Sequence, residues 1–180
     1  MGDIEIIGDL QIVQPVESAP PMGSAQAMGV IKPEDMRIFL PKRVLEEIWH
    51  YSTSRTDVEV GGMLVGSLRS YRGVNWIDIK GYLQVREAVQ NAASWRMTHD
   101  ACAAAERERD SRFNDQIFVG WHHTHPRYGV FLSSTDMFTC RSYFNLQWMV
   151  ALVVDPCAEE LGFFQWKNGR MEQCGFYFTQ

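Results

Sequence analysis

The chain has 180 residues, a length typical of one domain. Its composition, with 46% hydrophobic, 12% aromatic and 22% charged residues, is that of a globular protein and excludes a wholly disordered, collagenous or coiled-coil chain. The formal net charge of −5 disfavours nucleic acid as a partner, because such affinity comes from clustered lysine and arginine.

Residues 1–35 differ from the rest of the chain and are predicted to form an acidic, proline-containing arm and linker. The first 31 residues contain acidic side chains but no lysine or arginine, so the net charge belongs almost wholly to this arm. Isoleucine and leucine residues between positions 4 and 12 alternate with mostly polar ones. This pattern fits a strand that adds to a sheet edge and fits an unstructured tail equally well.

Residues 36–180 are expected to form one near-neutral domain that begins with a strand and a helix. The strand is predicted at residues 36–40, and Pro41 suits the first position of the helix. Apolar residues then recur at helical spacing opposite charged ones, which is typical of an amphipathic helix on a core; they are Val44, Leu45, Ile48 and Trp49.

Two strands are predicted next, at residues 59–68 and 75–86, with a turn at 71–73 between them. In the second strand, apolar side chains alternate with polar ones. A loop at residues 87–97 leads to a helix that begins after Thr98, a suitable N-cap, and ends near Phe113.

The remaining chain predicts further strands. Residues 116–121 and 149–154 are continuous apolar runs, typical of strands buried on both faces. Residues 162–167 and 171–178 flank Asn168-Gly169, which suits a two-residue type I′ hairpin turn. The fold class predicted from these elements is α/β or α+β, with a mixed sheet flanked by helices.

We expect a cytoplasmic protein that binds no membrane. The N-terminus lacks the basic segment and apolar core of a secretory signal. The longest uncharged apolar-rich run, residues 144–154, is shorter than the roughly 20 residues of a membrane span. Without a CxxC pair, and in a reducing compartment, the cysteines are expected to be packed thiols; they are Cys102, Cys140, Cys157 and Cys174.

Three histidines follow the predicted strand at 116–121. Residues two apart in an extended chain point the same way, so His123 and His125 can present two imidazoles to one point while His122 points away. Ser133 and Asp136 have the spacing of a helix cap with an acid at the third position, which would hold the carboxylate beside the histidines. Two imidazoles and one carboxylate leave a fourth zinc position open, as in catalytic sites.

Hydrolysis of an amide also needs a base, and Glu59 is the candidate. It lies among apolar residues and glycines, where partial desolvation would favour its protonated form and improve it as a proton shuttle. The pair Gly61-Gly62 allows close approach of another backbone. Ser133 is interpreted both as a helix cap and as a hydroxyl donor to the oxyanion of a tetrahedral intermediate.

These segments resemble the signature of the JAMM (MPN+) metalloprotease family. The resemblance covers about residues 36–178 and rests on Glu59 before Gly61-Gly62-Met63-Leu64-Val65-Gly66, on His123-Thr124-His125-Pro126, on Ser133-Ser134-Thr135-Asp136 and on Val153-Val154-Asp155-Pro156. It implies a cytidine-deaminase-like α/β fold, one zinc ion per chain, and hydrolysis after the C-terminal glycine of ubiquitin or a ubiquitin-like modifier.

The resemblance also implies a role for each matched residue. His123, His125 and Asp136 would be the zinc ligands, Glu59 the general base and then the acid, and Ser133 the oxyanion donor. The compact chain is most similar to bacterial members, some of which accompany E1-like and E2-like enzymes in antiviral defence. The loop at 87–97 occupies the place of the family's first insertion and is predicted to grip the modifier's tail.

Two alternatives remain open. The same chemistry suits a processing peptidase of a ubiquitin-like sulfur-carrier protein, and the metal could merely stabilise a non-catalytic surface that binds a modifier. Non-haem iron oxygenases also use two histidines and a carboxylate, although Glu59 and the fold pattern favour zinc. The stretch after Asp136 is too short for the long second insertion of linkage-specific members, so linkage preference stays open, as does the oligomeric state.

Overall fold

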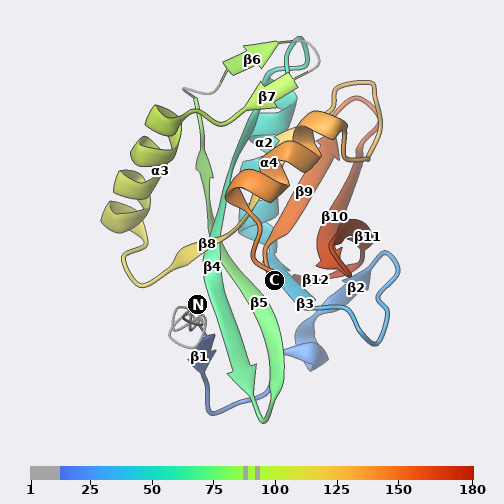
Figure 1. The fold of residues 1–180 in the computed structure, drawn as a ribbon. Helices are drawn as coiled ribbons and strands as arrows, with labels where there is room; N and C mark the ends of the chain where they lie inside the picture. The colour runs from blue at the N-terminus through green and yellow to red at the C-terminus, as the bar shows by residue number, and fades with distance from the viewer. Residues whose placement is uncertain (1–12, 87–88, 92–93) are drawn as a thin grey trace, which may run out of the picture.

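The computed structural model describes residues 13–86, 89–91 and 94–180. Over these ranges it shows a curled mixed sheet of ten strands with helices on both faces, which confirms the predicted mixed α/β fold (Figure 1). The strand order is β11-β10-β9-β8-β4-β5-β3-β12-β2, with β1 paired to β4 and a separate β6-β7 hairpin. The strands are β1 (Val13–Pro15), β2 (Gln26–Met28), β3 (Arg37–Pro41), β4 (Gly61–Tyr71), β5 (Val74–Gln84), β6 (Val89–Asn91), β7 (Ser94–Arg96), β8 (Ile117–Thr124), β9 (Val150–Asp155), β10 (Glu160–Lys167), β11 (Arg170–Cys174) and β12 (Phe176–Thr179).

The helices cover opposite faces of the sheet. Helix α2 (Lys42–Ser54) packs Val44 and Ile48 into one apolar core, and α3 (His99–Arg112) and α4 (Ser134–Tyr143) contribute to the other. A short 3-10 turn, η1 (Met22–Ser24), precedes β2. One apolar core lies on each face of the sheet. The two cores hold the sheet between the helices and so hold the ends of its strands in place.

The predicted helix starts are close to those observed. Helix α2 begins at Lys42, one residue later than expected. Pro41 is its N-cap and still belongs to β3, because its extended backbone pairs with Thr179 of β12. Thr98 caps α3 as predicted, and its side chain accepts a hydrogen bond from the Ala101 N–H.

The C-terminal hairpin confirms the turn and corrects the strand after it. Asn168 and Gly169 have φ angles of 49° and 77°, as a type I′ turn requires. The single strand predicted at residues 171–178 is wrong, because the chain breaks at Gly175 into β11 and β12. A Cβ at Gly175 would lie 2.6 Å from the carbonyl oxygen of Met28, so a glycine at this interruption allows another chain segment to approach closely.

Parts of the first 35 residues add strands to the sheet. Strand β1 pairs in parallel with β4 through Val13 and Leu68, and β2 pairs antiparallel with β12 through Met28 and Phe176. The alternating apolar residues at positions 4–12, for which the sequence leaves strand and tail open, lie outside the described residues.

The four cysteines are free thiols, as expected. Cys140 and Cys174 are buried and Cys102 partly so, but Cys157 is exposed in the turn after β9, so the expectation of packing is wrong for that residue. Among the helices in the described ranges, none is long and apolar enough to span a membrane.

Candidate active site

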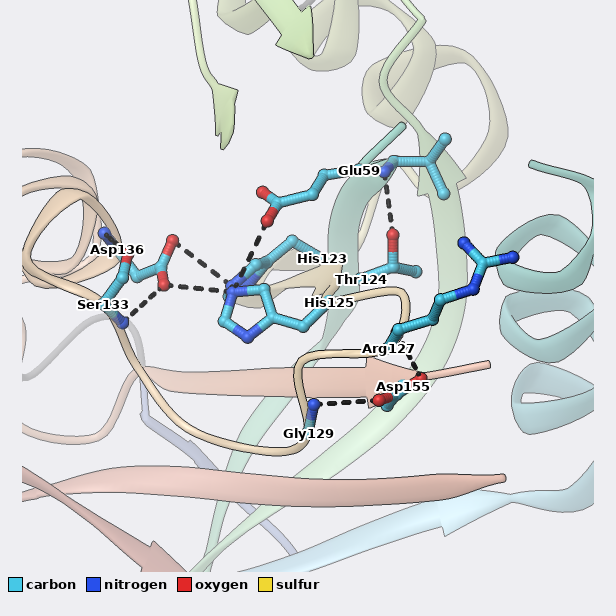
Figure 2. A network of polar contacts seen from close by, with 10 residues as sticks. Glu59, His123, Thr124, His125, Arg127, Gly129, Ser133, Asp136 and Asp155 are labelled. Atoms are coloured by element: carbon cyan, nitrogen blue, oxygen red, sulfur yellow. Dashed lines mark hydrogen bonds and ion pairs between the residues drawn. The ribbon is translucent and has the colours of Figure 1, made fainter. Parts of the chain in front are cut away.

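Three segments far apart in sequence bring the candidate residues together (Figure 2). His123 and His125 lie at the end of β8, Asp136 lies in the first turn of α4, and Glu59 lies just before β4. Strand β8 runs through Thr124, so the predicted end at residue 121 is wrong. The first two histidines belong to the strand because β8 pairs with β4 up to His123 and with β9 up to Thr124.

The two imidazoles and the Asp136 carboxylate converge on one point. The Nε2 atoms of His123 and His125 are 3.1 Å apart, and each lies 3.3 Å from a carboxylate oxygen of Asp136. All three side chains are buried. In a tetrahedral zinc site, bond lengths of about 2.0–2.2 Å put neighbouring ligand atoms roughly 3.3–3.6 Å apart. These residues therefore form a group that could hold a zinc ion after only small movements.

The protonation states of the cluster are set by its burial and by its neighbours. Burial lowers the pKa of His123, which favours the neutral imidazole that a metal requires. Burial also acts to lower the pKa of His125, but the hydrogen bond and charge of Asp136 and the charge of Glu59 outweigh it and raise this pKa. Burial acts to raise the pKa of Asp136, yet hydrogen bonds from both histidines hold it well below its usual range, so the carboxylate stays ionised.

Ser133 and Asp136 cap helix α4 reciprocally. The Ser133 N–H donates to Asp136 Oδ2 at 2.7 Å, and the Asp136 N–H donates to Ser133 Oγ at 3.2 Å. This capping box fixes the Asp136 carboxylate at the start of the helix, beside the histidines. Because Ser133 Oγ accepts the backbone hydrogen bond, its own proton is available to a substrate atom.

The Glu59 carboxylate points toward the cluster (Figure 2). Its Oε1 lies 3.8 Å from the Nε2 of His125, and the side chain is almost fully buried. Burial is the largest cause that raises the pKa of Glu59 to about 7; the charge of His125 acts against it, and the charge of Asp136 adds to it. A carboxyl group with this pKa can take and return a proton near neutral pH.

The glycines after Glu59 let its segment approach both neighbouring strands, β8 and β5, closely. A Cβ at Gly61 would lie 2.6 Å from the carbonyl oxygen of His122 and 2.8 Å from the Trp95 ring. A Cβ at Gly62 would lie 2.2 Å from the Leu83 carbonyl oxygen. A side chain at Gly61 would push Glu59 and its strand away from the histidines, whereas one at Gly62 would collide with β5 on the other side of β4.

His122 points away from the cluster, as expected. Its Nε2 lies 3.1 Å from the Ser52 hydroxyl and its Nδ1 lies 3.0 Å from the Tyr82 hydroxyl, and all three groups are buried. Burial lowers the pKa of His122 well below its ordinary value. Both ring nitrogens are thus used within the core, on the other face of β8.

Sequence reasoning did not assign a role to Asp155, which organises the loop after the histidines (Figure 2). Its carboxylate accepts hydrogen bonds from four backbone N–H groups; the donors are Arg127, Gly129, Cys157 and Ala158. Burial acts to raise the pKa of Asp155, but these hydrogen bonds outweigh it and lower it. The signals in the sequence were its position at the end of an apolar strand and its place in Val153-Val154-Asp155-Pro156, a segment that carries the family resemblance.

With this geometry in view, comparison with known proteins gives concordant results. Residues 35–147 match the family model described as JAB1/Mov34/MPN/PAD-1 ubiquitin protease. The chain is 31% identical over 125 residues to the 26S proteasome regulatory subunit RPN11 of Eremothecium gossypii. It is 30% identical over 125 residues to the ubiquitin carboxyl-terminal hydrolase RPN11 of Saccharomyces cerevisiae. Each alignment covers 66% of this chain but only 38% of the relative's length.

A solved structure supports the fold independently. The solution structure of protein DSY2949 from Desulfitobacterium hafniense superimposes with a TM-score of 0.62 at 19% sequence identity. The superposition covers 79% of this chain and 93% of that protein.

Proposed function

The chain belongs to the JAB1/Mov34/MPN/PAD-1 family of ubiquitin proteases, with the JAMM residue pattern, and from this premise we propose that it is a zinc-dependent isopeptidase or peptidase. The proposed bond is the one after the C-terminal glycine of a ubiquitin-like modifier, in a conjugate or in a precursor.

The observation that carries this proposal is the buried group of His123, His125 and Asp136 with the Glu59 carboxylate beside it. The ligand atoms are spaced as zinc requires, and the carboxylate outside the ligand set has the pKa of a proton shuttle. A purely structural zinc site normally has four protein ligands and no such carboxylate beside an open position.

We propose that His123, His125 and Asp136 hold the zinc ion. When bound, zinc would polarise the substrate carbonyl group and lower the pKa of water. Glu59 would accept the proton from the attacking water molecule and then deliver it to the leaving amine. The Ser133 hydroxyl would donate a hydrogen bond to the oxyanion that develops on the carbonyl oxygen.

A modifier with an extended tail is the proposed substrate class. The printed name of the yeast relative, ubiquitin carboxyl-terminal hydrolase, supports this choice, although the chain spans 38% of that protein's length. The β6-β7 hairpin is proposed to grip the tail, and its strands pair through Val89 and Arg96. Deleting the tip should raise KM; an unchanged kcat/KM on a modifier substrate would contradict this role.

The wider setting is proposed from the resemblance to compact bacterial members. In this setting the chain is a cytoplasmic enzyme that acts alongside E1-like and E2-like enzymes of a conjugation system, such as a system for antiviral defence. Residues 36–180 are proposed as the catalytic domain and residues 1–35 as an acidic arm.

The experiment is cleavage of candidate modifiers that carry C-terminal extensions. The metal-loaded protein is incubated with a single-residue extension and with a lysine-linked protein, with and without a zinc chelator, and the cut site is read by mass. Chelator-sensitive release of the lysine-linked protein supports an isopeptidase. Cleavage of the single-residue extension alone indicates a processing peptidase, and modifier binding without turnover on either substrate would contradict the proposed activity.

A further inference from the structure

One histidine of the cluster, His123, lacks the usual means of orientation. Metal-binding imidazoles normally donate a hydrogen bond from the second ring nitrogen, and this bond fixes the ring plane. Here the Nδ1 atom of His123 is buried and has no hydrogen-bond partner among the described residues. Another contact must therefore hold the ring of His123, which is fully buried.

That contact is an aromatic stack along β8. The ring centroids of Trp121 and His123 are 4.3 Å apart, and the two planes differ by 9°. The residues are two positions apart on one strand, so both side chains leave the same face of the sheet. The imidazole cannot rotate about its Cβ–Cγ bond without losing this parallel stack.

Trp121 itself packs against two further rings. Its ring stacks with Trp95 of β7 at 5.6 Å and 22°, and with Phe144 at 5.7 Å and 11°. Trp121 is fully buried, so its ring cannot turn without displacing these neighbours.

The electrostatics of the stack favour a metal-bound imidazole. The face of an aromatic ring is negative, and it attracts positive charge placed over it. An imidazole that binds a zinc ion carries part of the ion's charge, whereas a free neutral imidazole does not. The indole face therefore stabilises the bound form of His123 more than the free form.

We propose that Trp121 is a positioning residue that sets the ring plane of His123 by stacking, in place of the missing hydrogen bond. The inference rests on the proposed zinc site. It assigns the aromatic stack of Trp95, Trp121 and Phe144 to metal binding and not only to the core.

The test measures metal binding by purified full-length variants, with a chromophoric chelator as competitor and with Co²⁺ as a spectroscopic probe. Trp121→Leu should weaken the zinc Kd by roughly 10- to 100-fold, as loss of an orienting partner does in other metal sites, and should change the Co²⁺ absorption spectrum. Trp121→Phe keeps an aromatic face and should stay within about threefold of wild type with an unchanged spectrum. Phe144→Leu is the matched control, since it thins the same stack without touching His123.

The outcomes separate this inference from the proposed function. If the unsubstituted protein binds neither zinc nor Co²⁺, the zinc site itself is contradicted. If it binds both, then wild-type affinity in Trp121→Leu, or an equal loss in Phe144→Leu, overturns the role of Trp121.

A second measurement does not depend on the leucine variant being folded. Zinc binding should perturb the indole absorption band of the unsubstituted protein, because the charge arrives against the Trp121 face. The change should disappear in Trp121→Phe and persist in Trp95→Phe. A signal that persists in Trp121→Phe would overturn the proposal.

Discussion

Val60 and Thr124 hold each other through two hydrogen bonds. The Val60 N–H donates to Thr124 Oγ1, and the Thr124 N–H donates to the Val60 carbonyl oxygen, both at 2.9 Å. Thr124 lies between the two histidines of the cluster, and Val60 follows Glu59. This pair therefore ties the candidate base to the strand that carries the candidate ligands.

Thr124→Val removes the hydroxyl and keeps the volume. The Val60 N–H loses its buried partner, so the free energy of unfolding should fall by about 1–3 kcal/mol. Glu59 should shift relative to the histidines, and kcat should fall by roughly 10- to 100-fold while zinc content stays the same. Thr124→Ser keeps the hydroxyl, so its free energy of unfolding and its kcat should match those of wild type. Denaturant unfolding measures the first and steady-state kinetics the second. Equal kcat in the valine and serine variants would show that the bond does not position Glu59.

Ser133 has two roles that substitutions can separate. Ser133→Ala removes the cap of α4 and should lower the free energy of unfolding by about 0.5–2 kcal/mol. Ser133→Gly should lower it by only a few tenths of a kcal/mol. Both variants lack the hydroxyl, so both should lower kcat by about 10²- to 10³-fold if Ser133 stabilises the oxyanion. Ser133→Thr should restore activity. A fully active glycine variant would limit Ser133 to capping.

Tyr82→Phe tests whether His122 serves only the core. The variant leaves the Nδ1 of His122 without its partner at 3.0 Å, so the unfolding free energy should fall by about 1–3 kcal/mol. Zinc affinity and kcat/KM should be unchanged, because this network lies on the other face of β8. A loss of zinc affinity larger than the loss of stability would place His122 in the site.

Asp155 predicts a pH-dependent contribution to stability. Its pKa is lower in the folded state than the unfolded value of about 3.9, so its contribution is fully present above that value and is lost as the pH falls through the folded pKa. Asp155→Asn should therefore be less stable than wild type at pH 7, and the difference should shrink at acidic pH. Unfolding of the metal-free proteins across this range measures it. A difference that does not change with pH would contradict the ionised, backbone-bonded carboxylate.

Local signals predicted much of the fold because each acts over a few residues. The Thr98 cap, the proline before α2 and the Asn168-Gly169 turn all act through their own backbone. The break at Gly175 could not be predicted, since the segment that approaches this glycine, at Met28, is far away in the sequence.

The candidate site shows the same division. Periodicity placed His123 and His125 on one side and His122 on the other, and the Ser133-Asp136 spacing predicted the observed capping box. The stack of Trp121 on His123 and the bond between Thr124 and Val60 were not foreseen. Alternation shows which side chains share a face, but ring planes and partners on other strands depend on packing and register.

The most direct test of the proposed chemistry is the Glu59→Gln variant, with zinc content and cleavage measured on the same samples. Glutamine keeps the size and polarity of the side chain but cannot accept a proton at neutral pH, and Glu59 is not one of the proposed ligands. The variant should bind one zinc ion per chain with wild-type affinity, and its kcat on a modifier with a C-terminal extension should fall by about 10²- to 10⁴-fold. Undiminished cleavage by the zinc-loaded Glu59→Gln protein would contradict the account.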